Sequence, residues 1–271
     1  GTLGNGKEVA VKRLKDSKRN LKELEREISI VANLRHKNLL RFLGYCFEEN
    51  GGFSSMSMYQ IIVWRNFGTK GRIYYFAISA YFDYQKLQWA TWFNIITGVA
   101  RGLRYLHNKG IIHRNLKPHN VLVDENFDPK IADFYLMRVY NKEKTHESTE
   151  KVAGTFGYMA PECTSGPKLQ LSIKSDVYSY GVLVLEIITG RKINTFEGGN
   201  SEDLVEYVRD SASSCCYILL LYVQADRKRR PAMGHVTAML NSEATELPEP
   251  SLPGYIHRKS EHSMFELVAT S

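Results

Sequence analysis

The sequence has few of the features that define disulfide-rich, metal-binding or membrane-spanning proteins. It contains only four cysteines among 271 residues, and their positions match neither a metal-ligand spacing nor a disulfide framework. The longest strongly apolar run covers residues 215–223, far fewer than the roughly 20 residues needed to span a bilayer. No signal peptide opens the chain. These absences predict a protein of a reducing compartment, cytoplasmic as written and without a membrane segment in this chain.

Charge of one sign is not concentrated in any long stretch. The chain has 36 Lys and Arg against 29 Asp and Glu, a net charge of +7, and its one dense basic run is RKRR at residues 227–230. A run this short is typical of a solvated loop, so we expect no nucleic-acid binding. With 43% hydrophobic and 24% charged residues, the composition is that of a globular protein, large enough for one big domain or two lobes.

The first third of the chain predicts a small unit rich in strands. After a two-residue turn signal (NG), residues 8–14 alternate as a strand. Apolar spacings of three and four predict a helix near residues 21–31, and a further strand is expected within residues 35–47. Residues 50–80 show no clear periodicity, so no element is assigned to them.

The remainder of the chain predicts mostly helices. An amphipathic stripe indicates a helix that ends near Gly110. Almost every residue in 176–189 is apolar, which is typical of a helix buried on all sides, and Gly190 is its stop signal. Pro231 is expected to open a last helix. Short strands are expected at residues 111–112, 121–123 and 130–132.

Five short motifs follow one another in a fixed order. They are VAVK at residues 9–12, Glu27 on the predicted helix, HRNLKPHN at 113–120, DFY at 133–135 and APE at 160–162. Each motif alone carries little information. Together, in this order and at this spacing, they resemble the protein kinase family.

Several stretches resemble, in amino-acid sequence, the kinase domains of plant receptor-like kinases of the cysteine-rich or S-domain lectin subfamilies. Examples are GTFGYMAPE at residues 154–162 and LPEPSLPGY at 247–255. The resemblance implies an α+β, two-lobed protein kinase-like fold with an incomplete small lobe and a mainly helical large lobe. The expected domains are the small lobe at residues 1–86, with 50–80 irregular, the large lobe at 87–241, and an extended or disordered tail at 242–271.

The resemblance implies ATP and Mg²⁺ as cofactors, because phosphoryl transfer depends on positioning and charge neutralisation. Lys12 would hold the α- and β-phosphates and would itself be held by Glu27. Ala10 shares a face of the strand with Lys12 and is assigned to the same nucleotide site. Asn120 and Asp133 would supply the hard oxygen ligands that Mg²⁺ prefers.

Other residues of the motifs have catalytic-loop or structural roles in the family. Lys117 follows the catalytic position and gives the loop the form found in Ser/Thr kinases. Asp176 would accept hydrogen bonds from the catalytic-loop backbone, and Glu162 would pair with Arg230. The structural set implied by the resemblance is His113, Arg114, Glu162, Asp176 and Arg230.

The sequence departs from the family at places that matter for catalysis. Asn115 stands where the family has Asp, and loss of a general base typically costs about 10²–10⁴ in rate. Tyr135 stands where the family has Gly, whose backbone angles Tyr adopts at a cost of about 1–3 kcal/mol. The glycine-rich strand-turn-strand over the phosphates is absent because the chain starts after it, and residues 50–80 replace the hinge that holds the adenine. We therefore expect a catalytically impaired kinase, a pseudokinase or truncated relic, with ATP and Mg²⁺ binding weak or absent.

Two alternatives stay open. The first is an active ATP-dependent Ser/Thr protein kinase, in which positioning and Mg²⁺ carry most of the rate. The second and more remote is a P-loop NTPase, because Gly1, Gly6 and Lys7 come one residue short of a Walker-type phosphate loop: Glu8 stands where the loop needs Ser or Thr. In either kinase case the resemblance implies a protein partner or substrate, association with membrane receptor kinases, and a place on the cytoplasmic side of the plasma membrane if the chain is part of a longer receptor.

Overall fold

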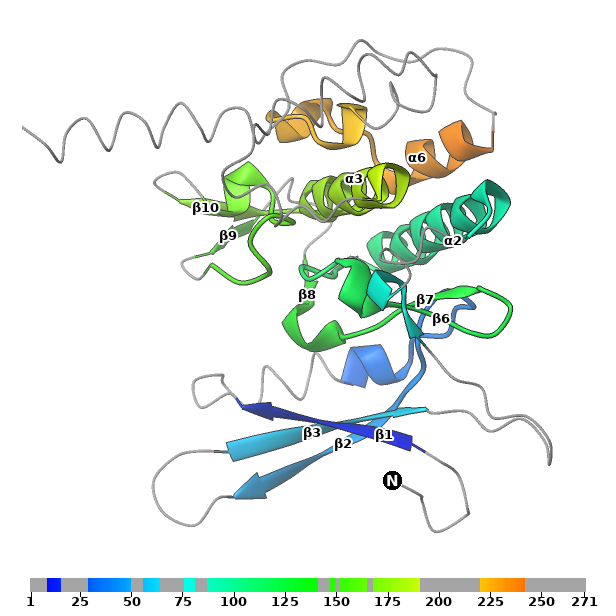
Figure 1. Cartoon of the computed structure of the whole chain (residues 1–271). Helices are drawn as coiled ribbons and strands as arrows, with labels where there is room; N and C mark the ends of the chain where they lie inside the picture. The colour runs from blue at the N-terminus through cyan, green and yellow to red at the C-terminus, as the bar shows by residue number, and fades with distance from the viewer. Residues whose placement is uncertain are drawn as a thin grey trace, which may run out of the picture.

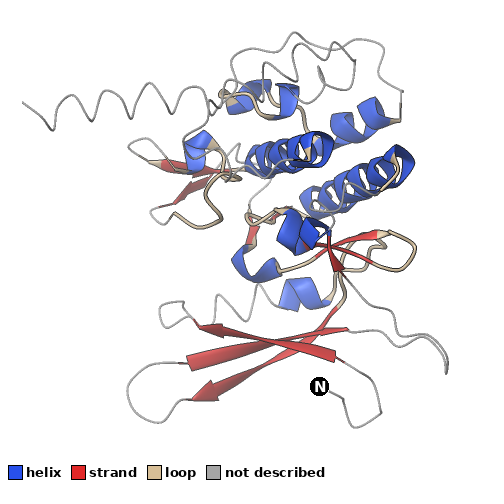
Figure 2. Cartoon of the chain, viewed as in Figure 1, coloured by secondary structure: helices blue, strands red, loops and turns tan. Residues whose placement is uncertain are grey.

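A three-stranded sheet lies at one end of the molecule and a helical layer at the other, with short strands between them (Figures 1 and 2). This arrangement is seen in a computed structural model and agrees with the predicted α+β class and mainly helical large lobe. The expected domain limits fall on or beside undescribed residues and stay predictions. The structure describes residues 9–15, 29–49, 56–63, 76–80, 87–140, 147–149, 152–164, 168–190 and 220–241.

The sheet consists of β1 (Val9–Lys15), β2 (Phe42–Glu49) and β3 (Met56–Val63), in the order β1-β3-β2. All pairings are antiparallel, and Met58 of the central strand lies opposite Leu14 on one side and Phe47 on the other.

The central strand β3 lies inside residues 50–80, to which the sequence pattern assigned no element. Its first half is poor in the β-branched residues that usually mark a strand. Both neighbouring strands pair with it and supply hydrogen-bond partners for its backbone. The strand is therefore fixed by this pairing, and its own residues give little indication of it. The expectation that the whole of this segment is irregular is therefore wrong for residues 56–63, and also for residues 76–80, which form a short strand and a 3₁₀ turn.

The helix α2 (Trp89–Asn108) supports the middle of the molecule. Its apolar stripe, which includes Ile95, Val99 and Leu103, is fully buried. Gly102 on the same helix allows a close approach, since a Cβ there would lie 3.0 Å from the backbone oxygen of Asn38. The helix thus packs directly against the loop that leads into β2.

Among the described helices, α3 (Ile173–Thr189) is the most extensively buried, as its apolar sequence predicts. Ser172 caps its start by accepting a hydrogen bond from the backbone of Lys174, and the Ser175 side chain completes a reciprocal capping box. Gly190 ends the helix with a φ of 64°, a left-handed conformation that glycine adopts without steric cost.

The last described helix, α6 (Met233–Leu240), begins two residues later than the sequence pattern predicts. Pro231 was expected to be its first residue. Arg230 before the proline is extended, with φ −72° and ψ 135°, as steric contact with a following proline favours. The chain remains extended through Ala232 and turns helical only at Met233.

Short antiparallel strands connect the sheet to the helices. β5 (Ile111–Ile112) pairs with β8 (Arg138–Val139), and β6 (Val121–Val123) pairs with both β4 (Phe76–Ala77) and β7 (Pro129–Ile131). These pairings bring residues far apart in the chain to the same place. The smaller described elements are η1 (Ile78–Ala80), η3 (Pro118–Asn120), η4 (Phe134–Leu136), β9 (Glu147–Thr149), η5 (Pro161–Cys163), β10 (Leu169–Leu171) and η7 (Arg227–Arg229).

The loop before β2 is attached to α2 by an aromatic stack. The His36 ring lies on the Tyr105 ring with centroids 4.9 Å apart, and its Nδ1 accepts a hydrogen bond from the Asn38 backbone at 3.1 Å. Burial, together with the positive charges of Lys37 and Lys130, lowers the pKa of His36. The ring is therefore held in its neutral form.

Among the described residues, no helix combines the length and the apolar character that a membrane crossing requires.

The close approach at Gly181 of α3 generates a first prediction. A Cβ at this position would lie 2.7 Å from Tyr222 Cβ and 2.8 Å from Val223 Cγ1. We expect Gly181→Ala to lower the free energy of unfolding by about 1–3 kcal/mol through overpacking, measured by urea denaturation. The matched control is Gly234→Ala in α6, where no atom lies within 4 Å of the new Cβ. That change should be neutral or should raise stability by up to about 1 kcal/mol; equal effects at the two sites would contradict the packing.

The lowered pKa of His36 predicts a pH dependence. Below about pH 6.5 the unfolded chain takes up a proton at this side chain that the folded protein resists, so stability falls as the pH decreases. His36→Phe keeps a ring over Tyr105 but cannot titrate. We therefore expect the melting temperature of the unmodified chain to fall more steeply between pH 7.0 and 5.5 than that of the variant. Parallel curves for the two proteins would show that this ring does not resist protonation.

Candidate active site

The residues 113–120 form a loop between β5 and β6 whose beginning is held by Asp176. The Asp176 carboxylate accepts hydrogen bonds from the backbone N–H groups of His113 at 2.8 Å and Arg114 at 2.9 Å, and His107 Nε2 lies 3.0 Å from it. The side chain is fully buried. Burial by itself raises the pKa of the Asp176 carboxyl, but the hydrogen bond from His107 and the other donors hold it below its usual value. The group therefore stays ionised and fixes the loop to α3.

The His113 ring links the loop to the residue before Asp133. Its Nε2 lies 3.0 Å from the Ala132 carbonyl oxygen, which can only accept, so Nε2 carries the hydrogen. Nδ1 is then the acceptor for the Asn115 backbone N–H at 3.3 Å. Burial lowers the pKa of His113, which keeps the ring neutral as this arrangement requires. Phe134 packs against the ring edge-on, with centroids 5.5 Å apart.

A chain of side-chain hydrogen bonds crosses the site through Asn115. Lys117 Nζ donates to Thr155 Oγ1 at 2.9 Å, and the Thr155 hydroxyl donates to Asn115 Oδ1 at 3.0 Å. Asn115 Nδ2 donates to Asp133 Oδ2 at 3.2 Å. The side chain of Asn120 also contributes, because its Nδ2 donates to the Asn115 carbonyl at 2.7 Å. The hydrogen bonds thus connect four predicted site residues, which are Asn115, Lys117, Asn120 and Asp133.

The backbone of Asp133, and not that of Tyr135, is in an unusual conformation. Asp133 has φ 65° and ψ 65°, a left-handed conformation that costs a non-glycine residue of order 1–3 kcal/mol. Tyr135 lies within the 3₁₀ helix η4 and is not among the described residues with positive φ. The expected strain at Tyr135 is therefore wrong: Tyr replaces Gly here without taking up a glycine conformation.

Asp133 and Asn120 are suited to hold Mg²⁺. The Ala132 N–H donates to the Asn120 carbonyl at 2.8 Å, so the two residues lie side by side. A carboxylate and an amide oxygen are hard ligands, and Mg²⁺ commonly takes one or two such groups together with substrate phosphates. Among the described residues no cluster of three or more His, Cys, Asp or Glu side chains could hold a metal ion by itself. The donor set therefore fits an ion that arrives with a nucleotide.

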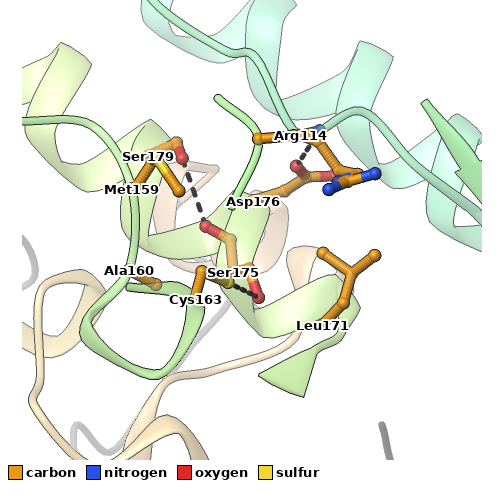
Figure 3. A pocket seen from close by; sticks show the side chains of 9 residues that line it. Arg114, Met159, Ala160, Cys163, Leu171, Ser175, Asp176 and Ser179 are labelled. Carbon is orange, nitrogen blue, oxygen red and sulfur yellow. Dashed lines mark hydrogen bonds between the residues drawn. The ribbon is translucent and has the colours of Figure 1, made fainter. Parts of the chain in front are cut away.

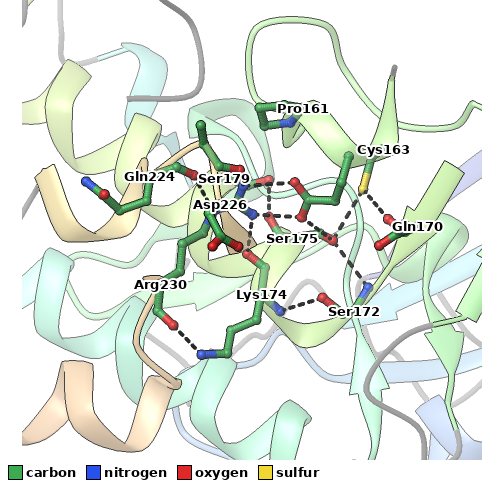
Figure 4. Close-up of polar contacts among 12 residues, drawn as sticks. Pro161, Cys163, Gln170, Ser172, Lys174, Ser175, Ser179, Gln224, Asp226 and Arg230 are labelled. Atoms are coloured by element: carbon green, nitrogen blue, oxygen red, sulfur yellow. Dashed lines mark hydrogen bonds and ion pairs between the residues drawn. The ribbon is translucent and has the colours of Figure 1, made fainter. Parts of the chain in front are cut away.

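Glu162 and Arg230 form an ion pair beside the start of α3, and Figure 4 shows Arg230 among its polar contacts. Arg230 is 1% exposed and binds Glu162 through both terminal nitrogens, at 2.7 and 2.8 Å. Its remaining N–H groups donate to the carbonyls of Gln224, Lys174 and Ala225 at 2.7–3.1 Å. All three nitrogens of the guanidinium therefore have partners.

A small pocket lies between α3 and the loop of residues 113–120, the catalytic loop of the resemblance (Figure 3). Arg114 and Asp176 lie on one side of it, and Met159 and Cys163 come from the segment that follows Thr155. Burial raises the pKa of the Cys163 thiol to about 11, so the thiol is neutral. The pocket lies beside Asp176, whose carboxylate is already hydrogen-bonded to the loop of residues 113–120.

Several contacts in the site join residues that the motifs did not single out. Tyr158 hydroxyl lies 2.9 and 2.8 Å from the two carboxylate oxygens of the buried Glu186. Burial and this carboxylate strongly raise the pKa of Tyr158, so the phenol remains the donor. Thr155 and His107 were missed in the same way. The signals available in the sequence were a Glu within an apolar helix and a Thr within the matched GTFGY stretch.

The predicted nucleotide residues of the small lobe are only partly described. Ala10 and Lys12 lie on β1, opposite Ile62 and Gln60 of β3. The side chain of Lys12 and the whole of Glu27 fall outside the described residues, so the expected Lys12–Glu27 pair stays a prediction.

The fold and the site together define a protein kinase domain. The chain belongs to the family described as protein tyrosine and serine/threonine kinase, whose model matches residues 2–237. This membership sets aside the P-loop NTPase alternative.

Within the family, the chain is similar to cysteine-rich receptor-like kinases of Arabidopsis thaliana. It is 41% identical to cysteine-rich receptor-like protein kinase 7, over 95% of this chain and 41% of that protein. It is 38% identical to kinase 5 of the same series, over 96% and 42% of the two chains, and 40% identical to kinase 6, over 94% and 40%. The chain thus spans about two fifths of the length of these curated relatives.

The Glu162–Arg230 pair generates a prediction about stability. Arg230→Met leaves the Glu162 carboxylate without its cation and exposes three carbonyl acceptors to an apolar side chain. Loss of one partner of such a buried pair costs about 3–5 kcal/mol of unfolding free energy, which urea denaturation would measure. The matched control is Arg229→Met at the neighbouring exposed position, where we expect a change within about 0.5 kcal/mol. A loss below about 1 kcal/mol at Arg230 would contradict the bracing role.

Proposed function

We propose that this chain is a receptor-like protein kinase domain of the Ser/Thr type whose phosphotransfer activity is weak or absent. The Ser/Thr assignment is supported by Lys117 in the catalytic loop and by the similarity to receptor-like kinases. The impairment rests on one observation, the amide of Asn115 at the position where the family has a carboxylate.

The contacts of Asn115 explain why it would be a poor substitute for the base. A substrate hydroxyl that attacks a phosphoryl group must lose its proton, and a neutral amide cannot take it up. The Asn115 Oδ1 already accepts the Thr155 hydroxyl hydrogen, and its Nδ2 is a donor that points to Asp133. The side chain therefore offers the substrate hydroxyl no basic atom. General-base loss accounts for about 10²–10⁴ in rate.

The other groups of the site would still serve positioning. Mg²⁺ bound with ATP would neutralise phosphate charge, and Asp133 and Asn120 are the residues that would hold it. Lys117 brings a positive charge to the same loop, where it favours an anionic phosphoryl group. We propose that Mg²⁺–ATP binding is weak, because the metal must displace the Asn115 amide from Asp133 Oδ2.

The partners and location follow from the same family assignment. A kinase domain acts on protein substrates, and the relatives are receptor-like kinases of which this chain spans about two fifths. We propose that the chain works as part of, or together with, a membrane receptor kinase, on the cytoplasmic side of the plasma membrane.

The test is a radiolabelled phosphotransfer assay with a generic basic protein as acceptor. We expect the unmodified chain to give little or no signal, and Asn115→Asp to raise the rate by up to about 10²–10⁴ because the two side chains are nearly isosteric. Asn115→Asp combined with Asp133→Asn serves as control: it should return to background, which excludes a contaminating kinase. Robust activity in the unmodified chain, equal to that of Asn115→Asp, would overturn the impairment and leave an active Ser/Thr kinase.

A further inference from the structure

We infer that Asn115 is a positioning residue that holds Asp133 in place without a divalent cation, so that the site is locked in a metal-free state. The feature that carries this inference is the contact of 3.2 Å between Asn115 Nδ2 and Asp133 Oδ2. The inference deepens the proposed function, and rests on it only in assigning Asp133 to metal binding.

The orientation of the Asn115 amide follows from the chemistry of its neighbours. Lys117 can only donate, so Thr155 Oγ1 accepts from it and keeps its own hydrogen for another partner. That hydrogen must go to an acceptor, which is Asn115 Oδ1 at 3.0 Å. The amide nitrogen then faces Asp133, whose carboxylate can only accept. Each bond in the chain from Lys117 to Asp133 has one donor and one acceptor, and the chain joins a positive end to a negative end.

A carboxylate at position 115 could not form the hydrogen bond to Asp133, because it has no hydrogen to donate. With Asp in this place, two carboxylate oxygens would face each other near 3.2 Å, without a hydrogen between them. Like charges at this distance repel unless a cation lies between them. The amide thus supplies locally what a metal ion would otherwise supply, a positive partner for Asp133 Oδ2.

Both ends of the contact are fixed, so the lock is rigid. The Asn115 backbone is held on one side by the His113 ring at 3.3 Å and on the other by Asn120 Nδ2 at 2.7 Å. Asp133 follows Ala132, whose N–H and carbonyl are both hydrogen-bonded to the loop. The Asp133 backbone itself is left-handed, a conformation that Asp adopts more readily than most residues other than glycine. Relief of a repulsion placed at this point would require a change in the torsions of one of the two side chains, because the backbone on both sides is hydrogen-bonded.

The inference predicts how Mg²⁺ affects thermal stability in the absence of nucleotide. The melting temperature of the full chain is measured at pH 8 with 0 to 10 mM MgCl₂, against KCl of equal ionic strength. The unmodified chain should show no shift specific to Mg²⁺. Asn115→Asp should melt roughly 2–4 °C lower without Mg²⁺, and should regain most of this loss when Mg²⁺ is added. The control Asn94→Asp adds the same charge at an exposed position on α2 and should show no Mg²⁺ dependence.

A swap of the two side chains tests the contact itself. In Asn115→Asp combined with Asp133→Asn, the donor and the acceptor exchange places, so the contact is again attractive. We expect the double variant to recover at least half of the melting-temperature loss of Asn115→Asp, without needing Mg²⁺, and a double-mutant cycle with Asp133→Asn alone measures the coupling. If Asn115→Asp does not fold without Mg²⁺, this loss of stability is in the expected direction. The double variant then tests the contact, because it should fold without Mg²⁺.

Three outcomes would overturn the inference. They are an Asn115→Asp melting temperature equal to that of the unmodified chain without Mg²⁺, a Mg²⁺ shift in the unmodified chain as large as in the variant, or a swap that recovers nothing. None of these depends on phosphotransfer. Robust phosphotransfer by the unmodified chain would instead count against the proposed function. The melting temperatures would still test whether Asn115 holds Asp133 in place without a metal ion.

Discussion

The catalytic loop depends on one buried carboxylate, that of Asp176. Moving an ionised group out of water costs several kcal/mol unless donors replace the lost hydration. Here the replacements are two backbone N–H groups, of His113 and Arg114, and the ring of His107. The carboxylate also lies in the first turn of α3, where the helix dipole favours negative charge. Because every one of these donors is needed, the loop cannot shift relative to α3 without leaving a buried charge uncompensated.

The same helix carries the rest of the framework. Near its other end Glu186 binds Tyr158, and beside its start the Glu162–Arg230 pair closes against the backbone of Lys174. Each contact joins α3 to a segment distant in the chain, and each is buried enough for one missing partner to be costly. Both acidic residues of α3, Asp176 and Glu186, thus have fixed partners. The result is a rigid base on which a single side chain, such as Asn115, decides how two loops meet.

The family, the α+β class and the proximity of residues 113–120 to Asp133 could be predicted from the sequence. Each motif can be read from a few neighbouring residues, and the order of the motifs indicates the family. Distant contacts were predicted only where both partners belong to the family's motifs, as for Glu162 with Arg230. The contacts of Thr155 with Asn115 and of His107 with Asp176, 40 and 69 residues apart, were missed because Thr155 and His107 were not singled out. The strand β3 was missed because its pairing comes from both neighbours and not from its own composition. The strain expected at Tyr135 was wrong because Tyr135 has no positive φ, whereas Asp133, two residues earlier, has φ 65°.

The exchange of a carboxylate for an amide at position 115 alters hydrogens and charge but hardly alters shape. Asp can only accept hydrogen bonds, whereas Asn both accepts and donates. The accepting oxygen still receives the Thr155 hydroxyl, so that side of the loop is unchanged. On the other side, the new donor turns the approach to Asp133 from a repulsion that needs a cation into a hydrogen bond. The same amide nitrogen of Asn115 thus carries both proposals, the missing base and the metal-free lock. The proposed loss of the base and the proposed metal-free lock would therefore be consequences of the same substitution.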